Sequence, residues 1–241
     1  MSSGTILPPL GFLAVEVKIH RPPGDPFNPQ TWPFPLIHEL VPGSQESQVV
    51  RTAYDSAFID RFVAAGNELA EKGCVGIITS CGFLALAQRE LAERIPIPVS
   101  TSALVQIPSV RALLPKESVV GVLTYDDERL GVAHLEALGV DPAGVRIRGM
   151  PADGHLRKVI QEGLDYDEKL MEQEMVDGAT RLVEDVRREG KEIGALVLEC
   201  TQMPPYAESI QKQIGKPVYD VYTMGMWFYS GLVRYRPSQW K

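Results

Sequence analysis

Residues 76–99, GIITSCGFLALAQRELAERIPIPV, contain a pattern that returns at 194–218 as GALVLECTQMPPYAESIQKQIGKPV. Each stretch runs from glycine through a β-rich segment to a cysteine, then through helix-like sequence to a Pro-Val pair where another strand begins. The cysteine, Cys81 or Cys200, precedes that proline by 17 residues in both stretches. Each stretch also follows a long amphipathic helix that ends in glycine. The shared order and spacing predict two related α/β halves.

Outside this repeat, strand-like and helix-like segments alternate along the chain. Strands are expected at 9–18, 118–126 and 145–149, and helices at 50–72, 102–114 and 167–189. Such alternation predicts parallel sheets covered by helices. We therefore expect an α/β protein of two similar three-layer α/β/α halves, related by pseudo-two-fold symmetry, with the active site in the cleft between them. Residues 1–115 together with 218–241 form the first expected domain, and residues 116–217 form the second.

The segment HRPPGDPFNPQTWPFP, at 20–35, is too rich in proline for a helix or a central strand. Its three aromatic side chains, Phe27, Trp32 and Phe34, favour an ordered loop that packs over another part of the molecule. Arg21 in this loop has two interpretations. It either binds a carboxylate through two parallel hydrogen bonds or stands in solvent on a turn.

Composition limits the kinds of partner. The chain of 241 residues has a formal net charge of −7, which offers no basic face for nucleic acid. The sequence has no run of about 18 apolar residues to cross a membrane, and its N-terminus has no basic leader before the first apolar stretch. We expect a cytoplasmic protein that acts on a small molecule.

The cysteines and histidines indicate neither a disulfide scaffold nor a metal centre. Three cysteines form an odd, sparse set, which favours a reducing compartment. None of the four histidines is close in sequence to a cysteine or to another histidine, so no metal ligand set is expected. Cys74, which precedes its strand and has no counterpart in the repeat, is expected in the core.

Cys81 and Cys200 each follow a strand, and ligands of open parallel sheets bind at the carboxyl ends of the strands. Two halves that face each other would place both thiols across one cleft. Two opposed acid/base groups can remove a proton from one face of a carbon and return one to the other face. The helix that starts after each cysteine should lower the thiol pKa, and its free N–H groups should bind a carboxylate or an enolate-like charge. The alternative is that both cysteines are small core side chains.

The motifs TSCGFLA and LECTQMP, at 79–85 and 198–204, resemble the two cysteine motifs of the cofactor-independent aspartate/glutamate racemase superfamily. That superfamily also includes hydantoin and allantoin racemases, maleate isomerases and arylmalonate decarboxylases. The resemblance covers most of the chain, including the strand GVLTYD at 121–126. Amino-acid racemases of the group have Asn-Thr after the first cysteine, where this chain has Gly82 and Phe83. The chain is thus similar to a poorly characterised branch, with a more apolar pocket.

The resemblance implies that the two repeat cysteines are the catalytic acid/base pair. Thr201 would bind the substrate carboxylate and Thr124 would line the same cleft, although either threonine could instead cap a helix or a turn. Gly82 and Phe83 occupy positions that bind polar groups of the substrate elsewhere in the superfamily. Arg21 completes the expected set of substrate-binding residues.

The expected function is that of a cofactor-independent racemase or epimerase, an isomerase. It would invert a carbon next to a carboxylate or amide carbonyl of an amino acid, a hydantoin or a related small acid. An arylmalonate-type decarboxylase and a maleate-type cis-trans isomerase remain open within the same superfamily. A non-catalytic protein that binds a small molecule in the cleft is the alternative from another class. A homodimer or higher homo-oligomer is the expected assembly, because dimers are common in the superfamily.

Overall fold

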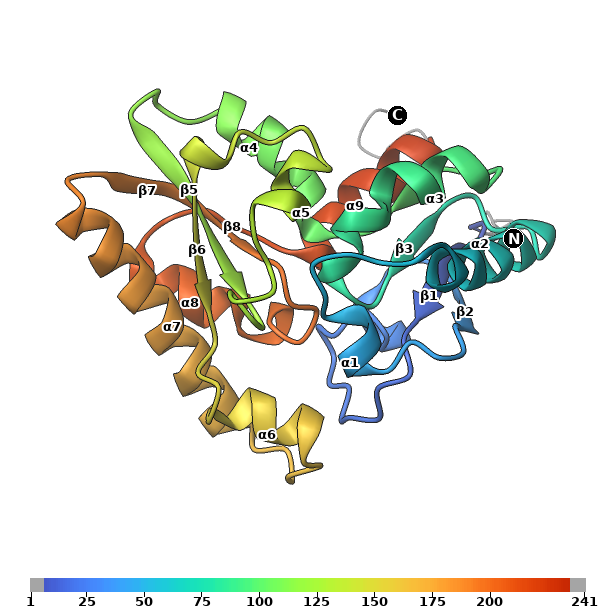
Figure 1. Cartoon of the computed structure of the whole chain (residues 1–241), viewed down its shortest axis with the longest axis horizontal. Helices are drawn as coiled ribbons and strands as arrows, with labels where there is room; N and C mark the ends of the chain where they lie inside the picture. Colours follow the sequence, from blue (N-terminus) through green and yellow to red (C-terminus); the bar gives the residue numbers. More distant parts are fainter. Residues whose placement is uncertain (1–6, 235–241) are drawn as a thin grey trace, which may run out of the picture.

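The computed structural model describes residues 7–234 and contains two four-stranded sheets of parallel strands (Figure 1). The first sheet, in the order β2-β1-β3-β4, contains β1 (Leu10–Ala14), β2 (Leu36–Leu40), β3 (Ile77–Thr79) and β4 (Val99–Ser100). The second sheet, in the order β6-β5-β7-β8, contains β5 (Ser118–Thr124), β6 (Val145–Gly149), β7 (Glu192–Leu198) and β8 (Val218–Tyr219). Each half places its second strand at one edge, beside its first. The equal strand orders confirm the two similar α/β halves that the repeat predicts.

Helices connect the strands and flank both sheets (Figure 1). The α-helices are α1 (Glu46–Val49), α2 (Ser56–Glu71), α3 (Gln88–Arg94), α4 (Ile107–Ala112), α5 (Val132–Glu136), α6 (His155–Gln161), α7 (Glu168–Arg188), α8 (Ala207–Ile214) and α9 (Val221–Leu232). Short 3-10 helices are η1 (Pro29–Thr31), η2 (Gly82–Ala87), η3 (Ala103–Gln106), η4 (Pro142–Gly144) and η5 (Pro204–Tyr206). Within residues 7–234, no helix is long and apolar enough to cross a membrane.

The long helix of the first half begins later than its apolar spacing predicts. Asp55 accepts a hydrogen bond from the Phe58 N–H at 2.7 Å and so caps α2 at Ser56. The helix ends before Gly73, whose φ of +82° is the left-handed conformation that favours glycine. The residues between 50 and 55 form an irregular turn, because the cap supplies a local start signal that outweighs the apolar periodicity.

The chain returns to the first half only after β8. This strand pairs in parallel with β7, so residues 218–219 belong to the second sheet and not, as expected, to the first domain. Helix α9 then packs on the first half, where a Cβ on Gly225 would lie 2.4 Å from the Trp32 ring and Tyr229 stacks on Phe34 with ring centroids 3.8 Å apart. The division into two domains stays a prediction, with this last boundary moved to follow residue 219. Residues 1–6 and 235–241, also assigned to the first domain, lie outside the described residues.

His134 on α5 joins the two halves through its contact with Phe83 in η2. The two rings meet edge to face, with centroids 5.3 Å apart. The imidazole is 1% exposed, and its Nδ1 accepts the Gly131 N–H at 3.3 Å. Burial is the main cause that lowers the pKa of His134 to about 4. The folded protein therefore favours the neutral ring.

We expect the free energy of unfolding to fall as the pH drops from about 6.5 toward 4. The pKa of His134 is lower in the folded than in the unfolded chain, so its contribution is complete above the unfolded pKa and is lost as the pH falls through the folded pKa. The loss is about 2 kcal/mol by pH 4.5. Urea denaturation of wild type and H134L at pH 7 and pH 4.5 measures it. A pH-dependent drop of equal size in both proteins would contradict this assignment.

Candidate active site

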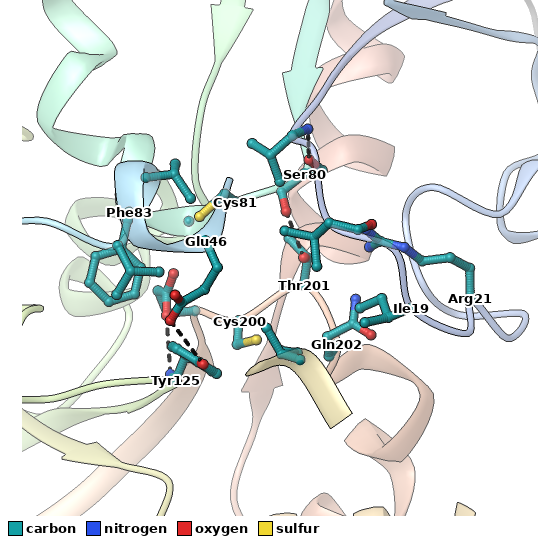
Figure 2. Close-up of a pocket in the computed structure, with 17 residues that line it drawn as sticks. Ile19, Arg21, Glu46, Ser80, Cys81, Phe83, Tyr125, Cys200, Thr201 and Gln202 are labelled. Atoms are coloured by element: carbon teal, nitrogen blue, oxygen red, sulfur yellow. Dashed lines mark hydrogen bonds between the residues drawn. The ribbon is translucent and has the colours of Figure 1, made fainter. Parts of the chain in front are cut away.

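A cavity opens between the two halves, at the carboxyl ends of their strands (Figure 2). Its empty space of about 460 Å³ includes the open solvent at its mouth. Both halves supply polar and ionisable lining residues: Arg21, Glu46 and Cys81 from the first, and Tyr125, Glu199 and Cys200 from the second. Among the described residues, no group of three or more His, Cys, Asp or Glu side chains is placed to hold a metal ion.

The structure brings the two repeat cysteines into this one cavity. Cys81 follows β3 and precedes η2, whereas Cys200 follows β7 in the other sheet. Figure 2 shows the two cysteines on opposite sides of the cavity. Cys81 is partly exposed and Cys200 is 8% exposed. Cys74, by contrast, is buried in the hydrophobic core, as its position in the sequence predicts.

Both cavity thiols are harder to ionise than a free cysteine. Burial raises the pKa of Cys81 and of Cys200, and the negative charge of Glu199 raises each further. The backbone N–H two residues after each cysteine, at Phe83 and at Gln202, lowers the pKa but less strongly. The expected net lowering by helix N-termini is therefore wrong, because desolvation outweighs the N–H groups. Both cysteines rest as neutral thiols at pH 7.

Glu199, directly before Cys200, is a functional candidate that the cysteine motifs alone do not reveal. Its side chain lines the cavity and is 1% exposed. Its Oε2 accepts a hydrogen bond from Thr124 Oγ1 at 2.6 Å and another from the Tyr125 N–H at 3.5 Å. Burial raises the pKa of Glu199 to about 7, and these two hydrogen bonds offset part of the effect. A glutamate that ends an apolar strand next to a cysteine is the sequence signal that could have identified it.

Thr124, expected to line the cleft, lies behind it instead. The side chain is fully buried and contacts the cavity only through the carboxyl group of Glu199, to which it donates its hydrogen bond. The sheet explains this position. Strands β5 and β7 are neighbours, with Leu123 opposite Leu198. The residues that follow, Thr124 and Glu199, therefore lie side by side. Thr124 therefore positions Glu199.

Gly82 is the point at which the first cysteine motif meets Glu199. A Cβ built on Gly82 would lie 2.3 Å from Oε1 of Glu199 and 2.5 Å from its backbone oxygen. The glutamate thus fills the space that a side chain at position 82 would need. Phe83 beside it is 1% exposed and lines the cavity. Glycine at position 82 of the motif TSCGFLA therefore leaves the space that Glu199 of the motif LECTQMP occupies.

We expect Gly82→Ala to lower the free energy of unfolding by about 2 to 3 kcal/mol. The added methyl group would collide with a backbone oxygen, which cannot rotate away as a flexible side chain can. Gly231→Ala is the matched control, because a Cβ at that helical position meets no atom within 4 Å. It should be neutral or stabilising by up to about 1 kcal/mol. Similar urea midpoints for the two variants would show that position 82 is not tightly packed.

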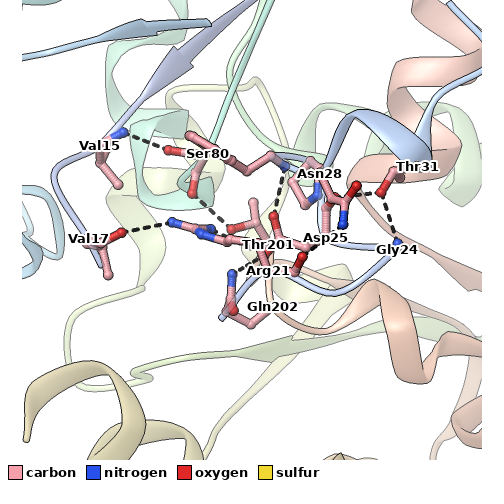
Figure 3. Close-up of polar contacts among 12 residues, drawn as sticks. Val15, Val17, Arg21, Gly24, Asp25, Asn28, Thr31, Ser80, Thr201 and Gln202 are labelled. Atoms are coloured by element: carbon pink, nitrogen blue, oxygen red, sulfur yellow. Dashed lines mark hydrogen bonds and ion pairs between the residues drawn. The ribbon is translucent and has the colours of Figure 1, made fainter. Parts of the chain in front are cut away.

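Arg21 is held at the cavity by the proline-rich loop and does not stand free in solvent (Figure 3). Its Nη1 pairs with Oδ2 of Asp25 at 3.2 Å, and its Nη2 donates to the Val17 carbonyl at 3.3 Å. The guanidinium also lies over the Phe27 ring, 5.2 Å from the centroid. The buried Asp25 accepts a further hydrogen bond from Gln202 Nε2 at 2.5 Å, which ties the loop to the turn after β7.

Thr201 also lines the cavity and connects the two cysteine turns (Figure 3). Its Oγ1 donates to the carbonyl oxygen of Ser80 at 2.9 Å. The Ser80 hydroxyl in turn accepts the Val15 N–H at 2.8 Å, so the connection reaches the end of β1. This bridge fixes the relative placement of the two halves at the bottom of the cleft. Binding of a substrate carboxylate by Thr201 stays a prediction.

The cavity has ends of opposite charge. Glu46 on α1 accepts hydrogen bonds from the Tyr125 hydroxyl at 3.0 Å and from Gln161 Nε2 at 3.1 Å. Figure 2 shows Arg21 and Glu46 on opposite sides of the cavity, with Cys81 next to Glu46. A molecule that carries both a negative and a positive group would find a partner for each.

Sequence comparison relates the chain to lyases. It is 26% identical over 231 residues to a dimethylsulfoniopropionate lyase from Durusdinium sp. clade D, which covers 93% of this chain and 75% of the relative. It is 25% identical to dimethylsulfoniopropionate lyases 3 and 7 of Emiliania huxleyi (strain CCMP1516), over 90% and 97% of this chain. The chain spans 57% and 70% of the lengths of those two relatives. No protein-family model matches it.

These relatives contradict the function expected from the cysteine pair. Two opposed thiols and the family motifs predict an isomerase of the racemase, epimerase or hydantoin-racemase-like kind, whereas the sequence relatives are lyases. The physical reason is that a racemisation and an elimination can both begin with removal of a proton, a step that a thiolate can perform in either. The spacing of the cysteines therefore does not distinguish between them.

Solved structures with the same architecture share little sequence with this chain. A crystal structure of arylmalonate decarboxylase matches with a TM-score of 0.61 and 17% identity, covering 95% of this chain and 96% of that one. Allantoin racemase from Pseudomonas fluorescens gives 0.59 and 17%, covering 93% and 91%. Glutamate racemase from Bacillus anthracis gives 0.52 and 16%, covering 92% and 81%. As the motifs TSCGFLA and LECTQMP predict, the chain has the fold of the Asp/Glu/hydantoin racemase superfamily.

Proposed function

We propose that this protein is a lyase that cleaves dimethylsulfoniopropionate or a closely related sulfonium carboxylate. The reaction breaks the C–H bond next to the carboxylate and the C–S bond to the sulfonium. It forms a carbon–carbon double bond and releases acrylate, dimethyl sulfide and a proton. Similarity to a dimethylsulfoniopropionate lyase over 93% of the chain supports this. The observation that carries the proposal is that two thiols share one cavity with a cationic end and an anionic end.

The charges of the cavity fit the charges of such a substrate. Within the described chain, Asp25 and Val17 engage two of the five N–H groups of Arg21, and the others can bind a carboxylate in the cavity. A sulfonium cation is attracted to carboxylates, and Glu46 supplies one at the other end. The Tyr125 ring beside it already carries the Arg157 guanidinium, 4.7 Å from the ring centroid. The substrate would therefore lie with its carboxylate toward Arg21.

This orientation assigns the base. Burial and then the charge of Glu199 raise the pKa of both thiols. Among the smaller causes, Asp25 raises and Arg21 lowers the pKa of Cys200, whereas Glu46 raises the pKa of Cys81, so the Arg21–Asp25 pair acts on Cys200 and Glu46 acts on Cys81. Cys200 thus lies toward the carboxylate end and would remove the proton from the adjacent carbon. Cys81 would lie beside the sulfonium. Dimethyl sulfide leaves as a neutral molecule, so its departure needs no acid.

The test is to incubate the purified full chain with dimethylsulfoniopropionate. Headspace gas chromatography measures dimethyl sulfide, and proton NMR measures acrylate, which should form in equal amounts. 3-(Methylthio)propionate is the control substrate, because it has the same carboxylate but no positive sulfur, and it should not be cleaved. The C81A/C200A double variant gives the background. Release of dimethyl sulfide no faster than this background would overturn the proposal.

A further inference from the structure

Glu199 occupies a place between the two cysteine turns that the elimination step does not explain. Its Oε2 is fixed by the hydrogen bonds from Thr124 and Tyr125. Its Oε1 accepts no hydrogen bond from residues 7–234 and lies against Gly82, 2.3 Å from where a Cβ would stand. Gly82 directly follows Cys81 and Glu199 directly precedes Cys200, so this second oxygen lies at the contact between the two cysteine turns. The charge of Glu199 accordingly acts on the pKa of both.

Each turnover leaves a proton on a buried thiol. Burial and then the charge of Glu199 raise the pKa of Cys200, so this thiol is a poor proton donor to water. The lining of the cavity contains two carboxyl groups, Glu199 and Glu46. Glu46 is partly exposed and bonded to Tyr125 and Gln161 at the far end, whereas Glu199 is adjacent to both cysteine turns. The geometry favours Glu199 as the acceptor.

We propose that Glu199 is the proton acceptor of the cysteine pair, a role that rests on the proposed function. The S–H bond of Cys200 breaks, its proton moves to Oε1 directly or through one water molecule, and the electron pair stays on sulfur. The thiolate then takes the substrate proton and becomes a thiol again. The carboxylic acid releases its proton to solvent, which matches the one proton that each elimination produces.

This role has a measurable consequence for the thiolate fraction. With the pKa of Glu199 raised to about 7 by burial, the carboxyl is ionised above that pH and the thiol and carboxyl hold one proton between them. The fraction present as thiolate plus carboxylic acid then stays constant as the pH rises, whereas the fraction with both groups ionised rises about tenfold per pH unit. The proposed role requires the first form to supply the reactive thiolate up to pH 9. Without the carboxyl, the thiolate fraction rises about tenfold per pH unit below the thiol pKa. The two cases differ in the shape of the profile.

Alkylation by iodoacetamide without substrate, followed by peptide mass spectrometry, measures this fraction at Cys200. In the wild type, we expect the rate to rise up to about pH 7 and then to change less than about threefold up to pH 9. In E199Q, we expect it to rise about 100-fold between pH 7 and pH 9. E199D, which keeps a carboxyl group, should restore the levelling-off.

E46Q is the matched control, because it removes the other carboxyl group of the cavity, and its profile should level off as the wild-type profile does. A wild-type rate that keeps rising to pH 9 would overturn the proposal without any variant. An E199Q rate that levels off near pH 7 would also overturn it, since a merely structural glutamate leaves the shape unchanged. No substrate is involved, so failure of this proposal is distinguishable from failure to release dimethyl sulfide.

Discussion

Cys200→Ala is expected to lower kcat/KM for dimethyl sulfide release about 1000-fold, whereas Cys81→Ala lowers it about tenfold. An elimination needs one base, and Cys200 is the thiol toward the Arg21 end, where the acidic C–H bond of the substrate would lie. Cys81 faces the sulfonium end, so alanine there removes a contact but no proton acceptor. Initial rates of dimethyl sulfide release, measured by headspace gas chromatography, give both values.

Controls for these two variants come from the third cysteine and from stability. Cys74→Ala lies in the hydrophobic core away from the cavity lining and should keep wild-type rates. Each alanine removes only one small buried group and should cost about 1 kcal/mol, which urea denaturation can verify. Equal losses of about 1000-fold in the two cavity variants would instead indicate two essential thiols and contradict the single-base scheme.

Arg21→Met in an Asp25→Asn background is expected to lower kcat/KM about 100-fold relative to Asp25→Asn alone. A charge-assisted hydrogen bond to a substrate carboxylate contributes about 1.5 to 3 kcal/mol, and the same positive charge makes the neighbouring C–H bond more acidic. The double background is needed because Asp25 is fully buried and pairs with Arg21 at 3.2 Å. Removing the arginine alone would leave a buried carboxylate without its cation.

Two further variants separate charge from geometry. Arg21→Lys keeps the positive charge but loses the planar fork, so its kcat/KM should fall between wild type and Arg21→Met. Arg89→Met removes an arginine whose side chain is 87% exposed and which, among residues 7–234, forms an ion pair only with Glu93 on the same helix, and it should have no effect. Steady-state kinetics with dimethylsulfoniopropionate provide the comparison. Unchanged kinetics in the Arg21 variants would place the substrate carboxylate elsewhere in the cavity.

Much of the fold can be predicted from the sequence, because the two repeat stretches have the same order of strand, cysteine and helix. The apolar strands before Cys81 and Cys200, and the 17-residue spacing that follows, predict two halves with equal strand orders. The edge strand β2 was not expected, since its five residues follow a proline-rich loop and none is fully buried. The short helix α6 was also not expected, because it has no side-chain cap and only two buried residues.

The site is predictable only in part, for a physical reason. Cysteine position follows from strand ends, but the pKa of each thiol depends on burial and on Glu199, and neither is visible in spacing. Thr124 has the expected place at the end of β5, yet its side chain bonds the neighbouring strand and does not reach the cavity. The reaction class depends on which leaving group departs from the substrate after proton removal, and the two cysteine motifs do not indicate that group.

The return of the chain to the first half has a consequence for the order of assembly. The second sheet is built from one continuous segment, residues 118–219. Helix α9, which supplies Val221 and Met224 to the core beneath the first sheet, is made after all strands of the second sheet. On a ribosome, the second half can therefore fold while the first still lacks that helix. The first half therefore completes its core after the second sheet has been made, and the cavity between the halves forms only when both are folded.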